Sequence, residues 1–127
     1  MINRLNDNEL RLLLKKINVM VMVGVSASPL KASFFVARYF VLRGISVIPI
    51  NPNYEGQYLW GEKVLGKISD IQPDKRVDLI DIFRPSKEVP YIVHDTIKYL
   101  KPLGCKTVWM QIGIKNKQAA QIAKKSG

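Results

Sequence analysis

Cysteine and long apolar runs are almost missing from this chain of 127 residues. Its single cysteine, Cys105, has no partner for an internal disulfide, and a metal site built from clustered cysteines is excluded as well. The apolar runs have the length of strands and fall well short of the roughly 20 residues that span a bilayer. The residues before Val19 are too polar for a secretory signal. We therefore expect a cytoplasmic protein that has no membrane partner.

Acidic residues are scarce and unevenly placed. The chain holds 20 Lys and Arg against 10 Asp and Glu, which gives a net charge of +10. Residues 10–54 contain no acid, and neither do residues 96–127. Two interpretations fit this distribution. One is a lysine-rich solvated surface, and the other is a polyanionic ligand near the first and last thirds of the chain, either a nucleotide with several phosphates or a nucleic acid.

Strand-like and helix-like patterns alternate along the chain, whose length suits one domain over residues 1–127. Continuous β-branched runs predict buried strands, and apolar residues at helical spacing predict helices. The expected order is a helix over about 7–17, a strand at Val19–Val25, a helix to about Leu42 closed by Gly44, a strand at Ser46–Ile50, a connection over 51–73 with a short helix or hairpin, a strand at Val77–Phe83, a helix at Lys87–Leu100, a strand at Thr107–Ile112 and a helix at Lys115–Lys125. Pro49 suggests a strand end or a bulge at its position.

This alternation predicts an α/β fold with a Rossmann-like parallel sheet and helices on both of its faces. With the strands numbered along the chain, the expected strand order is 3-2-1-4. A ligand of such a sheet lies over the carboxyl ends of the strands where the order reverses, here between the first and fourth strands. The four segments that follow the strands are therefore where we expect ligand-binding residues.

The segment after the first strand has the features of an anion site. Gly24 allows a tight turn, and the hydroxyl groups of Ser26, Ser28 and Ser33 are hydrogen-bond donors. The following helix directs its N-terminal amides and the positive end of its dipole at this loop, and Lys31 adds a full charge. The loop does not match the strict dinucleotide fingerprint G-x-G-x-x-G. The alternative is a serine that only caps the helix.

The segment after the second strand bears on which nucleotide is bound. NAD sites place Asp or Glu here to accept hydrogen bonds from the ribose hydroxyls. This chain has Asn51, Pro52 and Asn53, and its first acid is Glu55. An acid would repel a phosphorylated ribose, so the sequence favours coenzyme A (CoA), with its 3′-phosphate, or NADP over NAD.

Four short segments together resemble a known family. They read G-V-S-A-S-P-x-K-A-S, V-I-P-I-N-P, D-x-F-R-P-S-x-x-V and W-x-Q-x-G-I-x-N, and each follows or contains the end of an expected strand. In this order they resemble the stand-alone CoA-binding domain proteins, which are similar to the CoA-binding domain of the succinyl-CoA synthetase α subunit. The resemblance covers residues 19–127. It implies a Rossmann-type fold that holds CoA and has no established reaction of its own.

The resemblance also implies a set of site residues in four groups. Pyrophosphate would be cradled by Gly24, Val25, Ser26, Ala27, Ser28, Lys31 and Ser33. The adenosine side would be lined by Asn51 and Pro52, the adenine would be closed in by Phe83, Arg84 and Pro85, and the pantetheine arm would face Gln111, Ile112 and Gly113. For Arg84, a salt bridge to Glu88 is an equal alternative.

We therefore expect noncovalent binding of CoA or a short acyl-CoA without evident catalysis. Neither His94 nor Cys105 has a supporting acid–base partner in the sequence, and Asp78 and Asp81 fall on opposite faces of a strand. No metal site is expected. The alternatives are an NADP-dependent reductase or ligase fragment, and a basic nucleic-acid-binding module, which is the less favoured.

The end of the chain gives an expectation about assembly. Relatives of the family continue into a further strand beyond Gly127, so the final strand of the sheet is expected to be missing here. The apolar strand 107–112 would then have an open outer edge. We expect a homodimer through this edge, with cover by the N-terminal helix, by a partner protein or by flanking Lys106 and Lys115 as alternatives.

Overall fold

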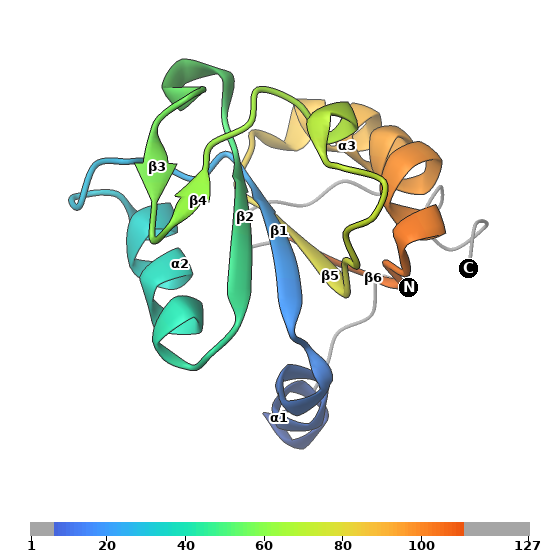
Figure 1. Ribbon diagram of the computed structural model, residues 1–127. Coiled ribbons are helices and arrows are strands. Elements are labelled where there is room, and N and C mark those ends of the chain that lie inside the picture. Colours follow the sequence, from blue (N-terminus) through green and yellow to red (C-terminus); the bar gives the residue numbers. More distant parts are fainter. Residues whose placement is uncertain (1–6, 111–127) are drawn as a thin grey trace.

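The computed structural model describes residues 7–110, which form a parallel sheet with helices packed against it (Figure 1). The main elements are α1 (Asp7–Lys16), β1 (Val19–Val23), α2 (Ala32–Leu42), β2 (Ser46–Ile50), β3 (Tyr58–Leu59), β4 (Glu62–Lys63), β5 (Leu79–Ile82), α3 (Val89–Asp95) and β6 (Thr107–Met110). Each predicted strand therefore exists, and so do the first two predicted helices. The predicted helix at Lys115–Lys125 lies outside the described residues.

The predicted strand order is wrong. Within the described residues the order in the sheet is β2-β1-β5-β6, and all pairs are parallel. The strand after residue 77, expected outside β2, lies instead beside β1, with Ile80 in register with Val21. The strand at 107–110, expected beside β1, pairs with β5 at the outer edge. The order thus reverses between β1 and β5, and the loops after these two strands are neighbours.

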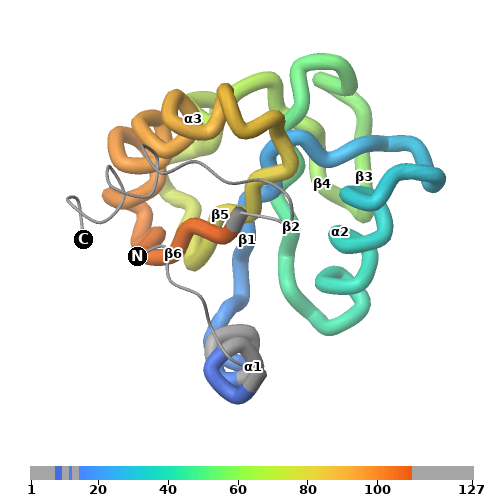
Figure 2. The backbone as a smooth tube through the Cα atoms, turned by 180° about the vertical axis from the view of Figure 1, so that it is seen from behind, coloured from blue at the N-terminus to red at the C-terminus, as the bar shows by residue number. Residues whose placement is uncertain are grey.

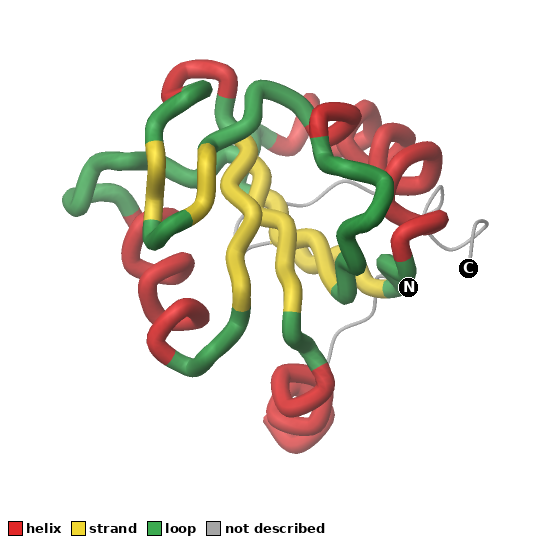
Figure 3. Tube along the Cα trace, in the orientation of Figure 1, coloured by secondary structure: helices red, strands yellow, loops and turns green. Residues whose placement is uncertain are grey.

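The place predicted for the third strand is occupied by the connection after β2. This connection forms a short helical turn and the β3–β4 hairpin, as expected (Figure 3). Leu65 then bridges Ile50 in parallel, accepting a hydrogen bond from the Asn51 N–H at 2.9 Å and donating to the Pro49 carbonyl at 2.9 Å. Pro49 lies inside β2 and not at its end or at a bulge, because its side without an N–H faces this outer edge.

The two faces of the sheet are covered by different helices, as predicted (Figure 2). Helix α2 packs Ala37 and Phe40 against one apolar cluster, which includes Met20, Met22 and Leu79. Helix α3 packs Val89 and Val93 against the other, which includes Val21, Val23, Ile80 and Ile82. Burial on both faces explains why β1 reads as a continuous apolar run and why β5 is apolar apart from Asp81. None of the helices in residues 7–110 is long and apolar enough to cross a bilayer.

The predicted continuous helix at 87–100 is divided into several helical types. A 3₁₀ turn at Ser86–Glu88 precedes α3, and a π-helical segment at Thr96–Leu100 follows it. The Thr96 hydroxyl donates to the Ile92 carbonyl at 2.8 Å, a local bond that competes with regular helix geometry. The π-helical segment follows α3 and is therefore separated by this helix from the loop that begins at Phe83.

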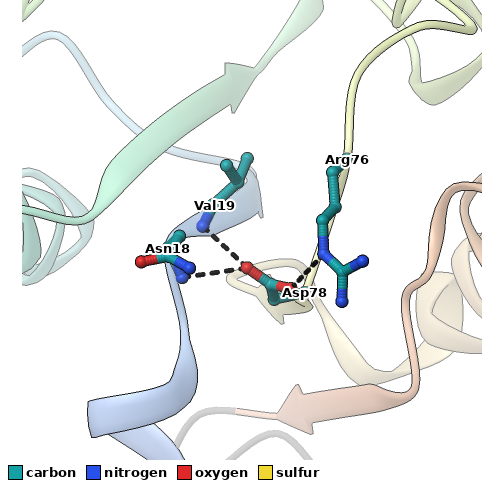
Figure 4. A network of polar contacts seen from close by, with 4 residues as sticks. All are labelled: Asn18, Val19, Arg76 and Asp78. Atoms are coloured by element: carbon teal, nitrogen blue, oxygen red, sulfur yellow. Dashed lines mark hydrogen bonds and ion pairs between the residues drawn. The ribbon is translucent and has the colours of Figure 1, made fainter.

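The amino ends of β1 and β5 are joined by a carboxylate (Figure 4). Asp78 accepts hydrogen bonds from the backbone N–H of Asn18 at 2.9 Å and of Val19 at 3.0 Å, and from Arg76 Nε at 3.1 Å. Burial by itself would raise the pKa of Asp78, but the two backbone donors and the Arg76 guanidinium hold it below the usual 3.8. The ionised carboxylate therefore stabilises this end of the sheet.

Candidate functional site

The carboxyl ends of three strands meet at one place. The Gly24 N–H donates to the Ile50 carbonyl at 2.8 Å, which ties the loop after β1 to the end of β2. The Phe83 N–H donates to the Val23 carbonyl at 2.8 Å, which ties the segment after β5 to β1. Three of the four sequence-predicted groups of site residues are thereby brought together.

Gly24 is required by the geometry of this meeting point. Its φ of +89° lies in the left-handed region, which side chains with a Cβ rarely adopt. A Cβ at this position would also collide with the Phe83 carbonyl oxygen and would stand 2.8 Å from Cδ of Arg84. The loop after β1 therefore passes directly beneath the backbone of Phe83 and the stem of Arg84.

Two of the predicted serines fix the shape of the loop. Ser33 Oγ accepts from the Ser26 N–H at 2.9 Å, and Ser26 Oγ accepts from the Ser28 N–H at 3.0 Å. Both Ser26 and Ser33 are buried. Ser28, half-buried, lies further out and accepts from the Leu30 N–H at 3.4 Å. The hydroxyls of Ser26 and Ser33 thus organise the loop, and Ser28 is the more accessible of the three.

The N-terminus of α2 has no side-chain cap. Lys31 occupies the cap position with extended backbone, no side chain bonds the first amides of the helix, and no acid lies in its first turn. The alternative in which a serine caps this helix is therefore not realised. An uncapped helix N-terminus carries unsatisfied N–H groups and partial positive charge. The exposed Lys31 adds a full positive charge beside it.

Asn51 connects the loop after β2 to the loop after β1. Its Nδ2 donates to the Val25 carbonyl at 2.9 Å, and its Oδ1 accepts from the Asn53 N–H at 3.0 Å. Tyr54, in the helical turn that Pro52 begins, places its hydroxyl 3.4 Å from Ser26 Oγ. Sequence reasoning missed Tyr54, because a single tyrosine in a connection carries no pattern that distinguishes it.

Arg84 forms the salt bridge that the sequence left as an alternative. Its Nη2 lies 3.0 and 2.9 Å from the two carboxylate oxygens of Glu88, four residues further on. The two side chains are 37% and 39% exposed, so the pair is at the surface and solvent screens it.

Among the other predicted site residues, Ala27 and Phe83 are half-buried, and Pro85 is exposed. Gln111, Ile112 and Gly113 lie outside the described residues.

Cys105 and Asp78 lie away from this site. Cys105 lies near the opposite, amino end of the sheet and is buried, and burial raises the pKa of its thiol to about 11. Asp81 is fully buried inside β5, whereas Asp78 is at the start of that strand. Among the described residues, the carboxyl ends offer amides, hydroxyls and cationic side chains, which suit the recognition of an anion.

Comparisons with known proteins point to the same family as the four sequence segments. The model of the CoA binding domain family matches residues 18–127. The chain is also similar to the Uncharacterized protein YneT of Bacillus subtilis (strain 168), with 26% identity over 119 residues, which are 94% of this chain and 82% of that protein.

Two solved structures share the fold over nearly the whole chain. One is cell-free ID.343 from Thermus thermophilus, 28% identical with a TM-score of 0.86, which matches 97% of this chain and 87% of that one. The other is a hypothetical protein from Pyrococcus horikoshii OT3, also 28% identical with a TM-score of 0.84, which matches 100% of this chain and 87% of that one. Since the family match includes every described loop at the carboxyl ends of the strands, this chain belongs to the CoA binding domain family.

Proposed function

We propose that this protein binds CoA or a short acyl-CoA noncovalently, with the phosphates over the loop between β1 and α2. The observation that carries the proposal is the uncapped, acid-free N-terminus of α2, which adjoins a loop already fixed by buried serines. A helix end of this kind is a favourable place for an anion. Family membership supports CoA as the anion.

The site residues fall into two proposed roles. Lys31 and Ser28, together with the first amides of α2, contact the pyrophosphate. Gly24, Ser26, Ser33 and Asn51 hold the loop, since their hydrogen bonds or backbone conformation are already used within the protein. Val25 contributes through its carbonyl, which accepts from Asn51, and Ala27 lies within the same loop.

The remaining groups are proposed from family resemblance and from position in the sheet. Asn51 and Pro52 line the adenosine side, and Phe83, Arg84 and Pro85 lie next to the adenine. Tyr54 joins them on the side of Ser26, because of its hydroxyl contact. Gln111, Ile112 and Gly113, which follow β6 in the sequence, are proposed to face the pantetheine arm.

Selectivity against NAD is expected from the end of β2. Asn51, Pro52 and Asn53 provide no carboxylate for the ribose hydroxyls. The first acid, Glu55, lies against Gly66, where a Cβ would come within 2.8 Å of the Glu55 carboxylate. A 3′-phosphorylated ribose therefore meets no carboxylate from the residues directly after β2.

Calorimetric titration with CoA, dephospho-CoA, NAD and NADP tests this function. We expect micromolar or tighter affinity for CoA and far weaker binding of NAD. Lys31→Ala should weaken CoA binding by about 1 to 3 kcal/mol, the scale of a hydrogen bond to a charged group, with an unchanged melting temperature. Lys75→Ala removes the same charge from an exposed position before β5 and should leave affinity unchanged.

Four outcomes would contradict the proposal. Equal affinity for NAD and CoA would remove the selectivity argued from the end of β2. Equal weakening by Lys31→Ala and Lys75→Ala would show that net charge, and not a defined phosphate site, governs binding. Preferential binding of NADP would favour the reductase alternative, and binding of nucleic acid that weakens steeply with salt would favour the basic-module alternative.

A cytoplasmic location and a homodimer through the edge of β6 complete the proposal. In the described part of the sheet β6 is an outer strand, and the proposed interface pairs the N–H and C=O groups of its outer edge. Light scattering over a range of concentrations, with Met110→Lys beside the parent protein, measures the assembly. A parent protein that stays monomeric at the highest concentration would rule out the homodimer.

A further inference from the structure

The outward side of α2 is apolar, which is unusual for a helix at a protein surface. Phe35, Tyr39 and Leu42 are spaced by four and three residues and so share one helix face. Their exposed fractions are 56%, 47% and 74%. The opposite side of the helix, with Ser33, Ala37 and Phe40, is already buried against the sheet. We name the exposed set, Phe35, Tyr39 and Leu42, the α2 stripe.

The corresponding helix on the other face of the sheet has no such stripe. Helix α3 exposes one large apolar side chain, Tyr91, and its other exposed residues are His94 and Asp95. The two helices lie on opposite faces (Figure 2), so each would meet different surroundings. The row of exposed apolar side chains therefore distinguishes α2 from α3.

The charged side chains of α2 and of the residues that flank it, 31–43, are all positive. Lys31, Arg38 and Arg43 are exposed, and residues 10–54 contain no acid. The Arg43 guanidinium carbon lies 4.6 Å above the Tyr39 ring, which holds a cation against the centre of the stripe. Tyrosine and arginine are among the residue types enriched at the energetic centres of protein interfaces.

We propose that the α2 stripe is the docking surface for an acidic amphipathic helix of a partner protein. Its apolar side would cover Phe35, Tyr39 and Leu42, and its carboxylates would pair with Arg38 and Arg43. Charge complementarity selects this occupant, because a second copy of the chain would place the same cations opposite one another across a two-fold interface. Lys31 begins the same helix, so the partner would lie next to the proposed phosphate site.

Fluorescence anisotropy with a designed peptide tests the docking surface on the full chain. The probe is a labelled helical peptide with leucine along one face and glutamate elsewhere, and its control is a scrambled peptide of the same composition. We expect saturable binding of the amphipathic peptide and at least about tenfold weaker binding of the scrambled one. Tyr39→Ala with Leu42→Ala should weaken the amphipathic peptide by a similar factor.

Matched variants separate the stripe from general effects. Tyr91→Ala removes a tyrosine of α3 that is even more exposed, at 74%, and should leave peptide binding unchanged. Because the stripe side chains are exposed, circular dichroism and CoA affinity of the Tyr39→Ala, Leu42→Ala protein should match those of the parent, which distinguishes this surface from the proposed CoA site. Phe35→Ala alone provides a second stripe variant with a smaller change.

Three results would overturn the proposal. Equal binding of the scrambled peptide would show attraction by charge alone. A parent dimer that dissociates in sedimentation when the stripe is substituted would assign the surface to a second copy. Stripe-dependent binding to vesicles of phosphatidylcholine and phosphatidylserine, without peptide binding, would assign it to an anionic lipid surface.

Discussion

The two ends of the sheet use their polar groups in different ways. At the amino end, Asp78 accepts two backbone N–H groups and an arginine, and this carboxylate stabilises the start of β1 (Figure 4). At the carboxyl end, the hydroxyl and amide groups of Ser26, Ser33 and Asn51 fix the loops, but the positive end of α2 has no capping side chain or acid. In the first arrangement the polar groups satisfy one another, and in the second the positive potential of the helix end stays uncompensated by a side chain.

Gly24→Ala should have the largest effect at the carboxyl end. The alanine has to adopt a φ near +89°, and its Cβ collides with the Phe83 carbonyl oxygen. Backbone strain and overpacking together should lower the free energy of unfolding by roughly 2 to 4 kcal/mol. CoA binding should be abolished, because the loop after β1 can no longer keep its position. Urea denaturation and calorimetry measure the two effects.

Gly44→Ala is the matched control for this substitution. Gly44 has a similar φ of +86° with nothing within 4 Å of a new Cβ, so only the backbone cost of about 1 kcal/mol remains. CoA binding should be retained. If both variants lost the same stability, the close approach of Phe83 to Gly24 would not be a constraint.

Asp78→Asn should have the largest effect at the amino end. Removing the charge weakens the hydrogen bonds from Asn18 and Val19 and should cost about 1.5 to 3 kcal/mol of stability, the range for bonds to charged groups. CoA affinity should not change, because Asp78 lies at the other end of β5.

Arg76→Ala is the milder variant of the same network. It should lower the free energy of unfolding by less than about 1 kcal/mol, since the Arg76 side chain is 75% exposed.

The pH dependence of this loss follows from the direction of the pKa shift. Hydrogen bonds hold the folded pKa of Asp78 below its unfolded value, so its contribution is fully present above pH ~4 and disappears as the pH falls through the folded pKa. The stability difference between the parent protein and Asp78→Asn should shrink over this acidic range. A difference that stayed constant down to the most acidic pH would contradict the role of the charge.

The sequence predicted the strands well and their order poorly, for a physical reason. Continuous apolar runs report burial on both faces, which holds for a strand anywhere inside a parallel sheet. The predicted order placed the third strand at the outer edge of β2. That edge is occupied by Leu65, which pairs with Ile50 through a single bridge, and a single bridge has no recognisable sequence pattern. At the site, the tight turn at Gly24 was predictable from turn chemistry, whereas the hydroxyls of Ser26 and Ser33, expected as donors to a ligand, accept hydrogen bonds within the loop. Tyr54 was not predictable, because only the folded connection brings it to Ser26.

Arg84→Gln should affect ligand binding more than stability. The surface pair with Glu88 contributes at most about 1 kcal/mol, whereas a lost contact to the ligand should weaken CoA binding by about 1 to 3 kcal/mol. Glu88→Gln breaks the same pair and keeps the guanidinium. If Arg84→Gln bound CoA as tightly as the parent, Arg84 would be only a partner of Glu88.

Cys105 gives the smallest expected effect, a difference in thiol reactivity at the amino end. Burial, with a further contribution from the negative charge of Asp78, raises the pKa of this thiol from 9.0 to about 11. Near pH 8 the thiolate fraction should therefore be roughly 100-fold below that of an ordinary cysteine, and limited access slows the reaction further.

Reaction with a thiol reagent measures this difference. The native protein should be modified slowly, at a rate that increases through pH 10, and the urea-unfolded chain should be modified rapidly. Asp78→Asn should speed the native reaction slightly, and saturation with CoA should not change it. Protection by CoA beyond that expected from its stabilisation of the folded state would show that the two ends of the sheet are coupled.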